Sequence, residues 1–157
     1  MKNKKYPQVI LYTDGASLGN PGKAGVAFIL YTPENELIRK EGRFIGTATN
    51  NVAEYLALIY GMQEALSLGA KEITCYTDSQ LLVRQLEGKY KVKSENLKLF
   101  YNQVKHLESL FKSVKYRHIS RSENKEADRL AKKAAERMRE WVAAGSGRLP
   151  EESPGTR

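Results

Sequence analysis

The chain has 157 residues, of which 41% are hydrophobic, so it can form one folded domain with a core but hardly two. Its formal net charge of +8 favours a polyanionic partner, nucleic acid or an anionic membrane surface, although a merely soluble basic protein fits the charge equally well. The sequence disfavours a transmembrane protein, because Ala24–Leu30, its longest apolar stretch, is too short to span a bilayer. It also disfavours a secreted protein and a disulfide-linked or zinc-thiolate protein, because residues 1–5 lead into no apolar secretion signal and Cys75 is the only cysteine.

The first half of the chain consists of short apolar, β-prone runs separated by turn-forming residues. We predict three strands, at Val9–Thr13, Gly25–Tyr31 and about Leu37–Ile45. The segment Ser17–Gly22 is dense in glycine, asparagine and proline, and Pro33–Asn35 provides a second turn. Because the connections are so short, we expect successive strands to pair as antiparallel hairpins.

The pattern becomes helical at Asn50–Asn51, either of which can act as N-cap. The helix predicted from Val52 to Leu68 is apolar on most faces, which is typical of a buried helix, and Gly69 ends it. We then predict a strand at Ile73–Thr77, helices at Ser79–Leu86 and about Asn96–Phe111, a strand at Val114–Ile119, and a last helix opened by Ser122 with Glu123. The apolar stripe of this last helix comprises Ala127, Leu130, Ala131, Ala134 and Met138.

The element order is therefore βββ-α-β-α-α-β-α, which indicates an α/β fold with a five-stranded mixed sheet flanked by helices. Helical crossovers imply that the strands beginning at Val9, Ile73 and Val114 are parallel, with the hairpin strands antiparallel at one edge. We expect residues 1–144 to form the domain. Residues 145–157 lack periodicity and read as a C-terminal tail.

Two aspartates occupy matched positions after apolar strands. Counting by twos places Asp14 on the same face as Tyr12, and Asp78 on the same face as Tyr76. In a parallel pair, both carboxylates would emerge at the carboxyl ends of adjacent strands, where open α/β sheets bind ligands. Each aspartate could instead start a turn or cap a helix, and the residues alone leave the two interpretations about even.

Two further acids are less obvious from their local patterns. Glu54 lies in the first turn of the most apolar helix, where an ionised carboxylate is rarely buried without a partner, and a metal ion would explain it better than the helix dipole. Asp128 lies beside Ala127 at the edge of a buried stripe, and its pattern alone favours a solvated helical residue. Oxygen ligands without cysteine favour Mg²⁺ or Mn²⁺ over zinc, and clustered carboxylates favour phosphodiester hydrolysis with two metal ions.

Four spaced motifs resemble the ribonuclease H family, type I. They are Thr13–Gly22, Thr49–Glu54, Thr77–Gln80, and His118–Asp128 with Asn124 and Ala127 in place. The resemblance covers about residues 7 to 140, and the predicted element order is also that of the family fold. It implies an endonuclease that hydrolyses the RNA strand of RNA–DNA hybrids, leaving 5′-phosphate and 3′-hydroxyl ends.

The resemblance also implies roles for individual residues. The catalytic set is Asp14, Glu54, Asp78, Asp128 and His118, of which the four acids would bind two Mg²⁺ ions, with Mn²⁺ able to substitute. His118 corresponds to a mobile histidine that helps protonate or release product. The substrate-binding set is Ser17, Asn20, Thr49, Asn50, Asn51, Gln80 and Asn124. Contacts to 2′-hydroxyls distinguish RNA from DNA, while Thr49 and Asn20 are candidates for a DNA phosphate pocket.

The chain departs from long family members between its second and third helices. That region, about Leu86 to Ser94, lacks the basic, tryptophan-containing extension, so the chain resembles the short form, in which Lys89, Lys91 and Lys93 partly replace the lost phosphate contacts. Arg84 stands where an amide is common.

We expect a cytoplasmic monomer whose partner is a hybrid duplex, without a membrane or an obligatory protein partner. The alternatives are a non-catalytic nucleic-acid-binding module and a same-fold nuclease for double-stranded RNA.

Overall fold

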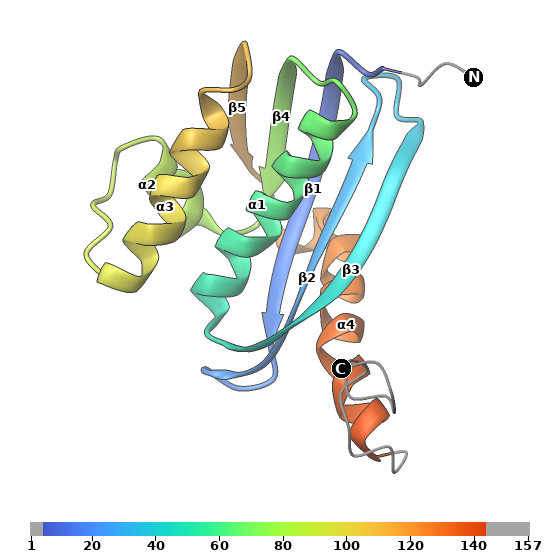
Figure 1. Cartoon of the computed structure of the whole chain (residues 1–157), viewed down its shortest axis with the longest axis vertical. Helices are drawn as coiled ribbons and strands as arrows, with labels where there is room; N and C mark the ends of the chain where they lie inside the picture. Colours follow the sequence, from blue (N-terminus) through green and yellow to red (C-terminus); the bar gives the residue numbers. More distant parts are fainter. Residues whose placement is uncertain (1–4, 144–157) are drawn as a thin grey trace, which may run out of the picture.

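The computed structural model of the chain, which describes residues 5–143 and side chains through Arg137, contains one five-stranded sheet (Figure 1). Its strands are β1 (Gln8–Ser17), β2 (Gly22–Tyr31), β3 (Leu37–Ala48), β4 (Glu72–Thr77) and β5 (Ser113–His118). Its helices are α1 (Asn50–Ser67), α2 (Gln80–Leu86), α3 (Glu95–Glu108) and α4 (Lys125–Ala143), with a 3₁₀ turn η1 (Arg121–Glu123) before α4.

The strands are arranged in the order β3-β2-β1-β4-β5. The pairs β1–β2 and β2–β3 are antiparallel, whereas β1–β4 and β4–β5 are parallel. The predicted class, element order and strand directions are therefore confirmed. The hairpin meander forms one half of the sheet, and each parallel strand is reached through helical connections, as right-handed crossovers require.

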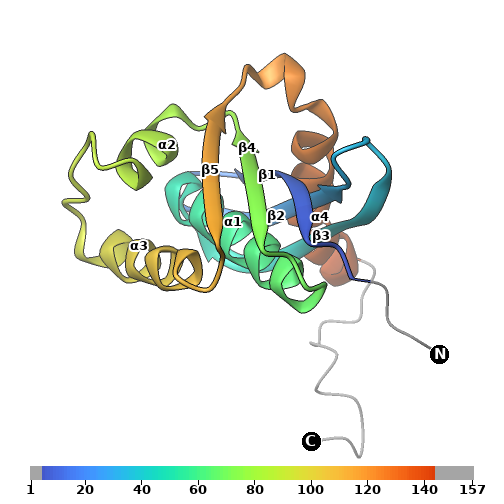
Figure 2. The same ribbon diagram turned by 90° about the horizontal axis from the view of Figure 1, so that it is seen from above.

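Helices cover both faces of the sheet. Figures 1 and 2 show α1 and α3 on one face and α4 on the other. Alternation along β1 explains the division, because Leu11 packs in the core beneath α1 while its neighbour Tyr12 packs toward α4. The α1 face carries most of the large buried side chains, and the α4 face is built from small ones such as Ala127 and Ala131.

Two glycines allow these helices to lie unusually close to the sheet. A Cβ atom on Gly15 would lie 2.4 Å from the carbonyl carbon of Ala53 in α1, and one on Gly25 would lie 2.4 Å from the carbonyl oxygen of Ala131 in α4. Real Cβ contacts are never this short, so any side chain at either position would push a helix away. The close approach at Gly15 also determines where the first turns of α1 lie.

Several predicted boundaries were wrong, each for a local reason. Strand β1 does not stop at Asp14 but continues to Ser17, because it keeps pairing with β2. The N-cap of α1 is Thr49, whose hydroxyl accepts from the Val52 N–H at 3.2 Å, not Asn50 or Asn51. Glu123 belongs to η1, where its carboxylate accepts from the Ser120 N–H at 2.9 Å, and α4 begins only at Lys125.

Two predictions cannot be placed on this structure. The Met138 side chain and the tail at 145–157 lie outside the described residues. Among residues 5–143, the helices are all too short or too polar to cross a membrane.

Candidate metal centre

The candidate site lies where β1 and β4 separate. Their last paired residues are Tyr12 and Tyr76, whose rings stack with centroids 5.0 Å apart and planes at 18°. The stacking confirms that these side chains share a face, so Asp14 and Asp78 stand in matched positions two residues further on. Because β4 ends while β1 continues along β2, the edge of β1 beside Asp14 lacks a β4 neighbour (Figure 1).

A third carboxylate reaches this gap from α1. Carboxylate oxygens of Asp14, Glu54 and Asp78 all lie within 4.8 Å of one another. Glu54 is in the second turn of α1, not the first as predicted, and the close contact of that helix with Gly15 brings it over the end of β1. The structure thus brings together three of the four acids singled out in the sequence.

Burial and the repulsion of neighbouring charges make the carboxyls of Asp14 and Glu54 hard to ionise without a cation. Burial, the charge of Asp78 and a hydrogen bond with Asp128 raise the pKa of Asp14 to about 8. Burial, together with the charges of Asp14 and Asp78, also raises the pKa of Glu54 well above its ordinary value. A divalent cation would reverse both effects by offsetting the repulsion.

The donor set fits such a cation. One carboxylate oxygen of Glu54, Oε1, is buried and has no hydrogen-bond partner among the described residues. Unpaired buried oxygens are costly unless a ligand supplies the missing interaction. Three hard oxygen donors at this separation suit Mg²⁺ or Mn²⁺.

The fourth acid, Asp128, lies beside the group of three. It is hydrogen-bonded to Asp14, its N–H donates to the Asn124 carbonyl at 3.0 Å, and its Oδ2 lies 3.2 Å from the Lys132 ammonium. Asp14, Asp78 and Asp128 are all the aspartates in the chain, so every aspartate lies at this one place. Asp128 does not converge with the other three as a common ligand set.

Asn124 supports the site from behind. Its side chain is 2% exposed, and its Nδ2 donates to the Thr13 carbonyl at 2.9 Å and to Asp78 Oδ2 at 3.1 Å. A residue this buried, with both amide hydrogens used internally, holds Asp78 in place and is poorly placed to contact a duplex. Its sequence pattern offered no signal for this positioning role.

Other predicted substrate residues join the loop after β1 to the start of α1. The Asn50 side chain accepts from the Ser17 N–H at 3.1 Å, and the Asn50 N–H donates to Asn20 Oδ1 at 3.0 Å. The Ser17 hydroxyl donates to the Ala48 carbonyl at 2.9 Å. Asn20 and Asn50 are exposed beside Thr49, so these residues form one braced surface near the acids.

The remaining predicted site residues lie on the surface around the acids. Asn51 is exposed and lines a shallow depression together with Glu54 and Ser79. Gln80, the first residue of α2, is also exposed. His118 is exposed at the end of β5, paired in register with Thr77, which directly precedes Asp78.

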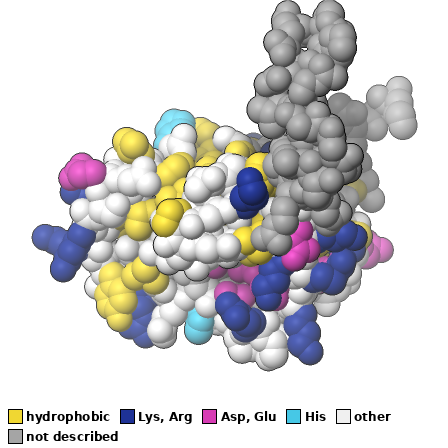
Figure 3. Space-filling model, turned by 90° about the horizontal axis from the view of Figure 1, so that it is seen from below, with side chains coloured by type: hydrophobic (Ala, Val, Ile, Leu, Met, Phe, Trp, Pro, Cys, Tyr) yellow, Lys and Arg dark blue, Asp and Glu magenta, His cyan; other side chains and the backbone are white. Residues whose placement is uncertain are grey.

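The short connection between α2 and α3 folds back onto α2. The Arg84 guanidinium lies 5.3 Å from the ring centroid of Tyr90, so the arginine that replaces the common amide is stacked locally. Lys89 pairs with Glu87 at 3.3 Å, whereas Lys91 and Lys93 make none of the ion pairs found among the described residues. Figure 3, seen from the carboxyl end of β1, shows acidic side chains gathered near the centre of the face with lysines and arginines beside them.

A mixed sheet of this order is a ribonuclease H-like fold, and the acids that converge where its central strands separate are compatible with binding of a metal ion. Comparisons with known proteins agree. A family model described as reverse transcriptase-like matches residues 12–134. Ribonuclease H1 of Halobacterium salinarum superposes with a TM-score of 0.81 and 36% identity, covering 83% of this chain and 98% of that one. The chain belongs to the ribonuclease H family.

Two further comparisons extend this assignment. The structure of LC11-RNase H1 in complex with an RNA/DNA hybrid has a TM-score of 0.79 and 35% identity, covering 83% of this chain and 98% of that one. A bifunctional protein of Mycobacterium tuberculosis is 41% identical over 138 residues, which are 87% of this chain and 38% of that protein. The chain therefore spans well under half the length of that curated relative, and 64% of the Halobacterium salinarum ribonuclease HI sequence.

Proposed function

We propose that this chain is an endonuclease that hydrolyses the RNA strand of RNA–DNA hybrids and leaves 5′-phosphate and 3′-hydroxyl ends. The observation that carries the proposal is the convergence of Asp14, Glu54 and Asp78 within 4.8 Å on a ribonuclease H fold. The hybrid bound to LC11-RNase H1 supports the substrate class, and the net charge of +8 suits a polyanion.

The four acids Asp14, Glu54, Asp78 and Asp128 would hold two Mg²⁺ ions. Such ions activate water and stabilise the leaving oxygen in phosphodiester hydrolysis. The chain itself prepares the ligands: the small Gly15 lets Glu54 approach Asp14. Asp128 is held by the Lys132 ammonium on one side and by Asp14 on the other.

His118 would handle a proton at the leaving oxygen. It is exposed, and its register with Thr77 places it on the same edge of the sheet as Asp78. An exposed imidazole at this place can donate a proton to the leaving oxygen and can move with departing product.

Recognition of the duplex would rest on the amide-rich surface beside the acids. Asn50, Asn51 and Gln80 are exposed donors and acceptors able to contact 2′-hydroxyls and base edges in a minor groove. Thr49 and Asn20, braced through Asn50, would hold a DNA phosphate. Lys91 and Lys93 would add phosphate neutralisation from the short connection after α2.

A comparison of three substrates tests this function. The RNA strand is labelled in a hybrid and in a double-stranded RNA, one strand of a DNA duplex is labelled, and each is incubated with Mg²⁺ or with EDTA. We expect Mg²⁺-dependent cleavage of the hybrid alone. Faster cleavage of double-stranded RNA than of the hybrid would show that double-stranded RNA is the substrate. Binding without any cleavage would identify a nucleic-acid-binding module.

The variant Asp78→Asn tests the metal centre in the same assay. It removes one ligand charge but keeps an oxygen acceptor for Asn124, so we expect cleavage to fall at least about a hundredfold, as for other single electrostatic groups in active sites, with little change in fold. The matched control is Glu95→Gln, which removes the charge of an exposed acid on α3. Wild-type cleavage by Asp78→Asn would show that the metal assignment is wrong.

A further inference from the structure

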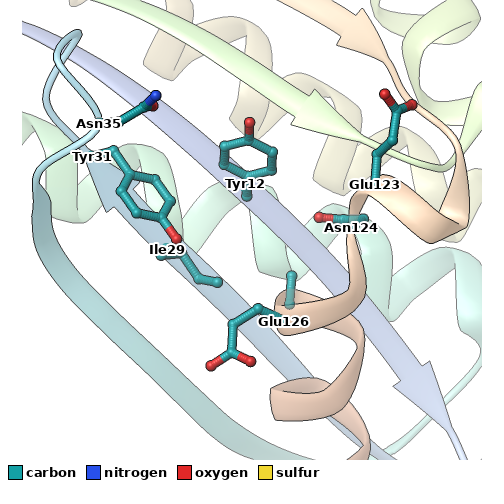
Figure 4. Close-up of a pocket in the computed structure, with 8 residues that line it drawn as sticks. Tyr12, Ile29, Tyr31, Asn35, Glu123, Asn124 and Glu126 are labelled. Carbon is teal, nitrogen blue, oxygen red and sulfur yellow. The ribbon is translucent and has the colours of Figure 1, made fainter.

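A cavity lies on the α4 face of the sheet, beside Asn124, the residue that hydrogen-bonds Asp78. Its volume is about 330 Å³, roughly ten times the share of one water molecule in the liquid. Figure 4 shows it between β1, β2 and the start of α4. Its walls include Tyr12, Ile29, Tyr31, Glu123, Asn124 and Ala127.

Asn124 presents an unused acceptor to this cavity. Both hydrogen bonds of its Nδ2 go to acceptors, the Thr13 carbonyl and Asp78 Oδ2, so the opposite atom of the amide must be the oxygen. Asn124 is only 2% exposed, and this buried oxygen has no hydrogen-bond partner among the described residues. Figure 4 shows it directed toward Tyr12, across the cavity. A ligand that satisfies it must donate a hydrogen bond.

The charge of the lining also favours a donor. Although the chain has a net charge of +8, the lining contains two glutamates and neither lysine nor arginine. The Glu126 carboxylate already forms ion pairs, with the Lys40 ammonium at 3.0 Å and with the Arg129 guanidinium at 2.8 Å. Glu123 uses Oε1 to accept from Ser120, which leaves its Oε2 outside every hydrogen bond found in residues 5–137.

Aromatic rings complete the environment. Tyr12 and Tyr31 meet edge to face with centroids 5.7 Å apart, and both line the cavity. Aromatic faces beside a carboxylate attract organic cations through their quadrupoles.

We propose that this cavity binds the primary ammonium group of a small aliphatic amine. The ammonium would donate to Asn124 Oδ1 and to Glu123 Oε2, with its carbon chain against Tyr12, Tyr31 and Ile29. Because the same amide donates to Asp78, a donor on its oxygen would polarise it and strengthen that bond. Occupancy of the cavity is thereby coupled to a ligand of the metal centre.

Titration of cadaverine into the metal-free full chain, without nucleic acid, tests the proposal. By calorimetry we expect one saturable site with a dissociation constant of about 0.1–1 mM, the range for a ligand this small. In nitrogen-edited NMR spectra the Asn124 side-chain amide should shift during the titration. The neutral analogue 1-pentanol should bind far more weakly, since it lacks the charge. Absence of saturable binding, or equal binding of both compounds, would overturn the proposal.

Variants locate the site and identify the ligand class. Glu123→Gln and Tyr31→Leu should each weaken cadaverine binding about tenfold, the effect of losing one hydrogen bond to a charged group or one aromatic wall. The matched control Glu95→Gln should bind as wild type. Loss of binding in Glu54→Gln, which alters the metal centre and not the cavity, would overturn the assignment. Tighter binding of N-acetyl-lysine methylamide than of cadaverine would also overturn it, in favour of a protein side chain.

Discussion

Replacing Asp14 with asparagine should make the metal-free protein more stable while abolishing its cleavage of hybrids. Asp14 is only 4% exposed, and burial, the charge of Asp78 and the hydrogen bond with Asp128 raise its pKa from 3.8 to about 8. Asparagine has nearly the same shape and can still hydrogen-bond, but it never carries the charge that this environment opposes. It also lacks the charge that a metal ligand needs.

The sign and the size of the change in the free energy of unfolding follow from proton linkage. The folded protein keeps the Asp14 proton up to a pH of about 8, whereas the unfolded chain releases it near the ordinary value of 3.8. Between these values the folded state binds more protons, so a rising pH lowers the free energy of unfolding, and this loss is complete above about pH 8. The full shift corresponds to a ceiling of about 6 kcal/mol. Because the neighbouring carboxyls titrate together, we expect a gain of about 2–3 kcal/mol for Asp14→Asn at pH 8.

Thermal unfolding in EDTA, followed by circular dichroism, measures this gain. The melting temperature of Asp14→Asn should exceed that of wild type by roughly 5–10 °C at pH 8 and by less at pH 5. Added Mg²⁺ should raise the melting temperature of wild type more than that of the variant, because only wild type keeps the full ligand set. A variant that melts with wild type at pH 8, or whose advantage does not grow with pH, would refute the reasoning.

Three further predictions concern the surroundings of the acids. Gly15→Ala should lower the free energy of unfolding by about 1–3 kcal/mol and weaken Mg²⁺ binding, measured by urea denaturation and calorimetry, because α1 must move outward. Asn124→Ala should lower kcat more than it changes KM, since it frees Asp78 without touching the duplex, and steady-state kinetics will separate the two. Replacing Lys91 and Lys93 together by alanine should weaken hybrid binding in EDTA and reduce its salt dependence by up to about two counterions, measured by fluorescence anisotropy.

Side-chain parity predicted matched positions for Asp14 and Asp78, but left it open whether they form one ligand site or start turns. Alternation places each aspartate two residues beyond a tyrosine on the same face, and the stacked rings of Tyr12 and Tyr76 show that the two strands are in that register. The position of Asp14 within β1 was not predictable in this way. It depends on β4 ending earlier than β2, and local sequence carries little information about the length of a partner strand.

The site residues on or beside the helices were also only partly predictable from local sequence. The apolar surroundings of Glu54 indicated a functional carboxylate, but its approach to Asp14 depends on a contact between Gly15 and α1 that joins distant segments. Asn124 was predicted as a substrate contact from family spacing, and only the fold reveals its burial and its bond to Asp78. Asp128 also required the family resemblance, because a helical aspartate near a lysine is ordinary on any surface.

The most direct test of the central claim is the chemistry of the product ends. A hybrid with one labelled RNA strand is cleaved with Mg²⁺ in water enriched in heavy oxygen, and the fragments are analysed by mass spectrometry. Attack by water predicts heavy oxygen in the new 5′-phosphate, an unlabelled 3′-hydroxyl, and no products in EDTA or with Asp78→Asn. Cyclic or 3′-phosphate ends would mean that the RNA 2′-hydroxyl is the nucleophile, and would contradict a metal-dependent hydrolysis at Asp14, Glu54 and Asp78.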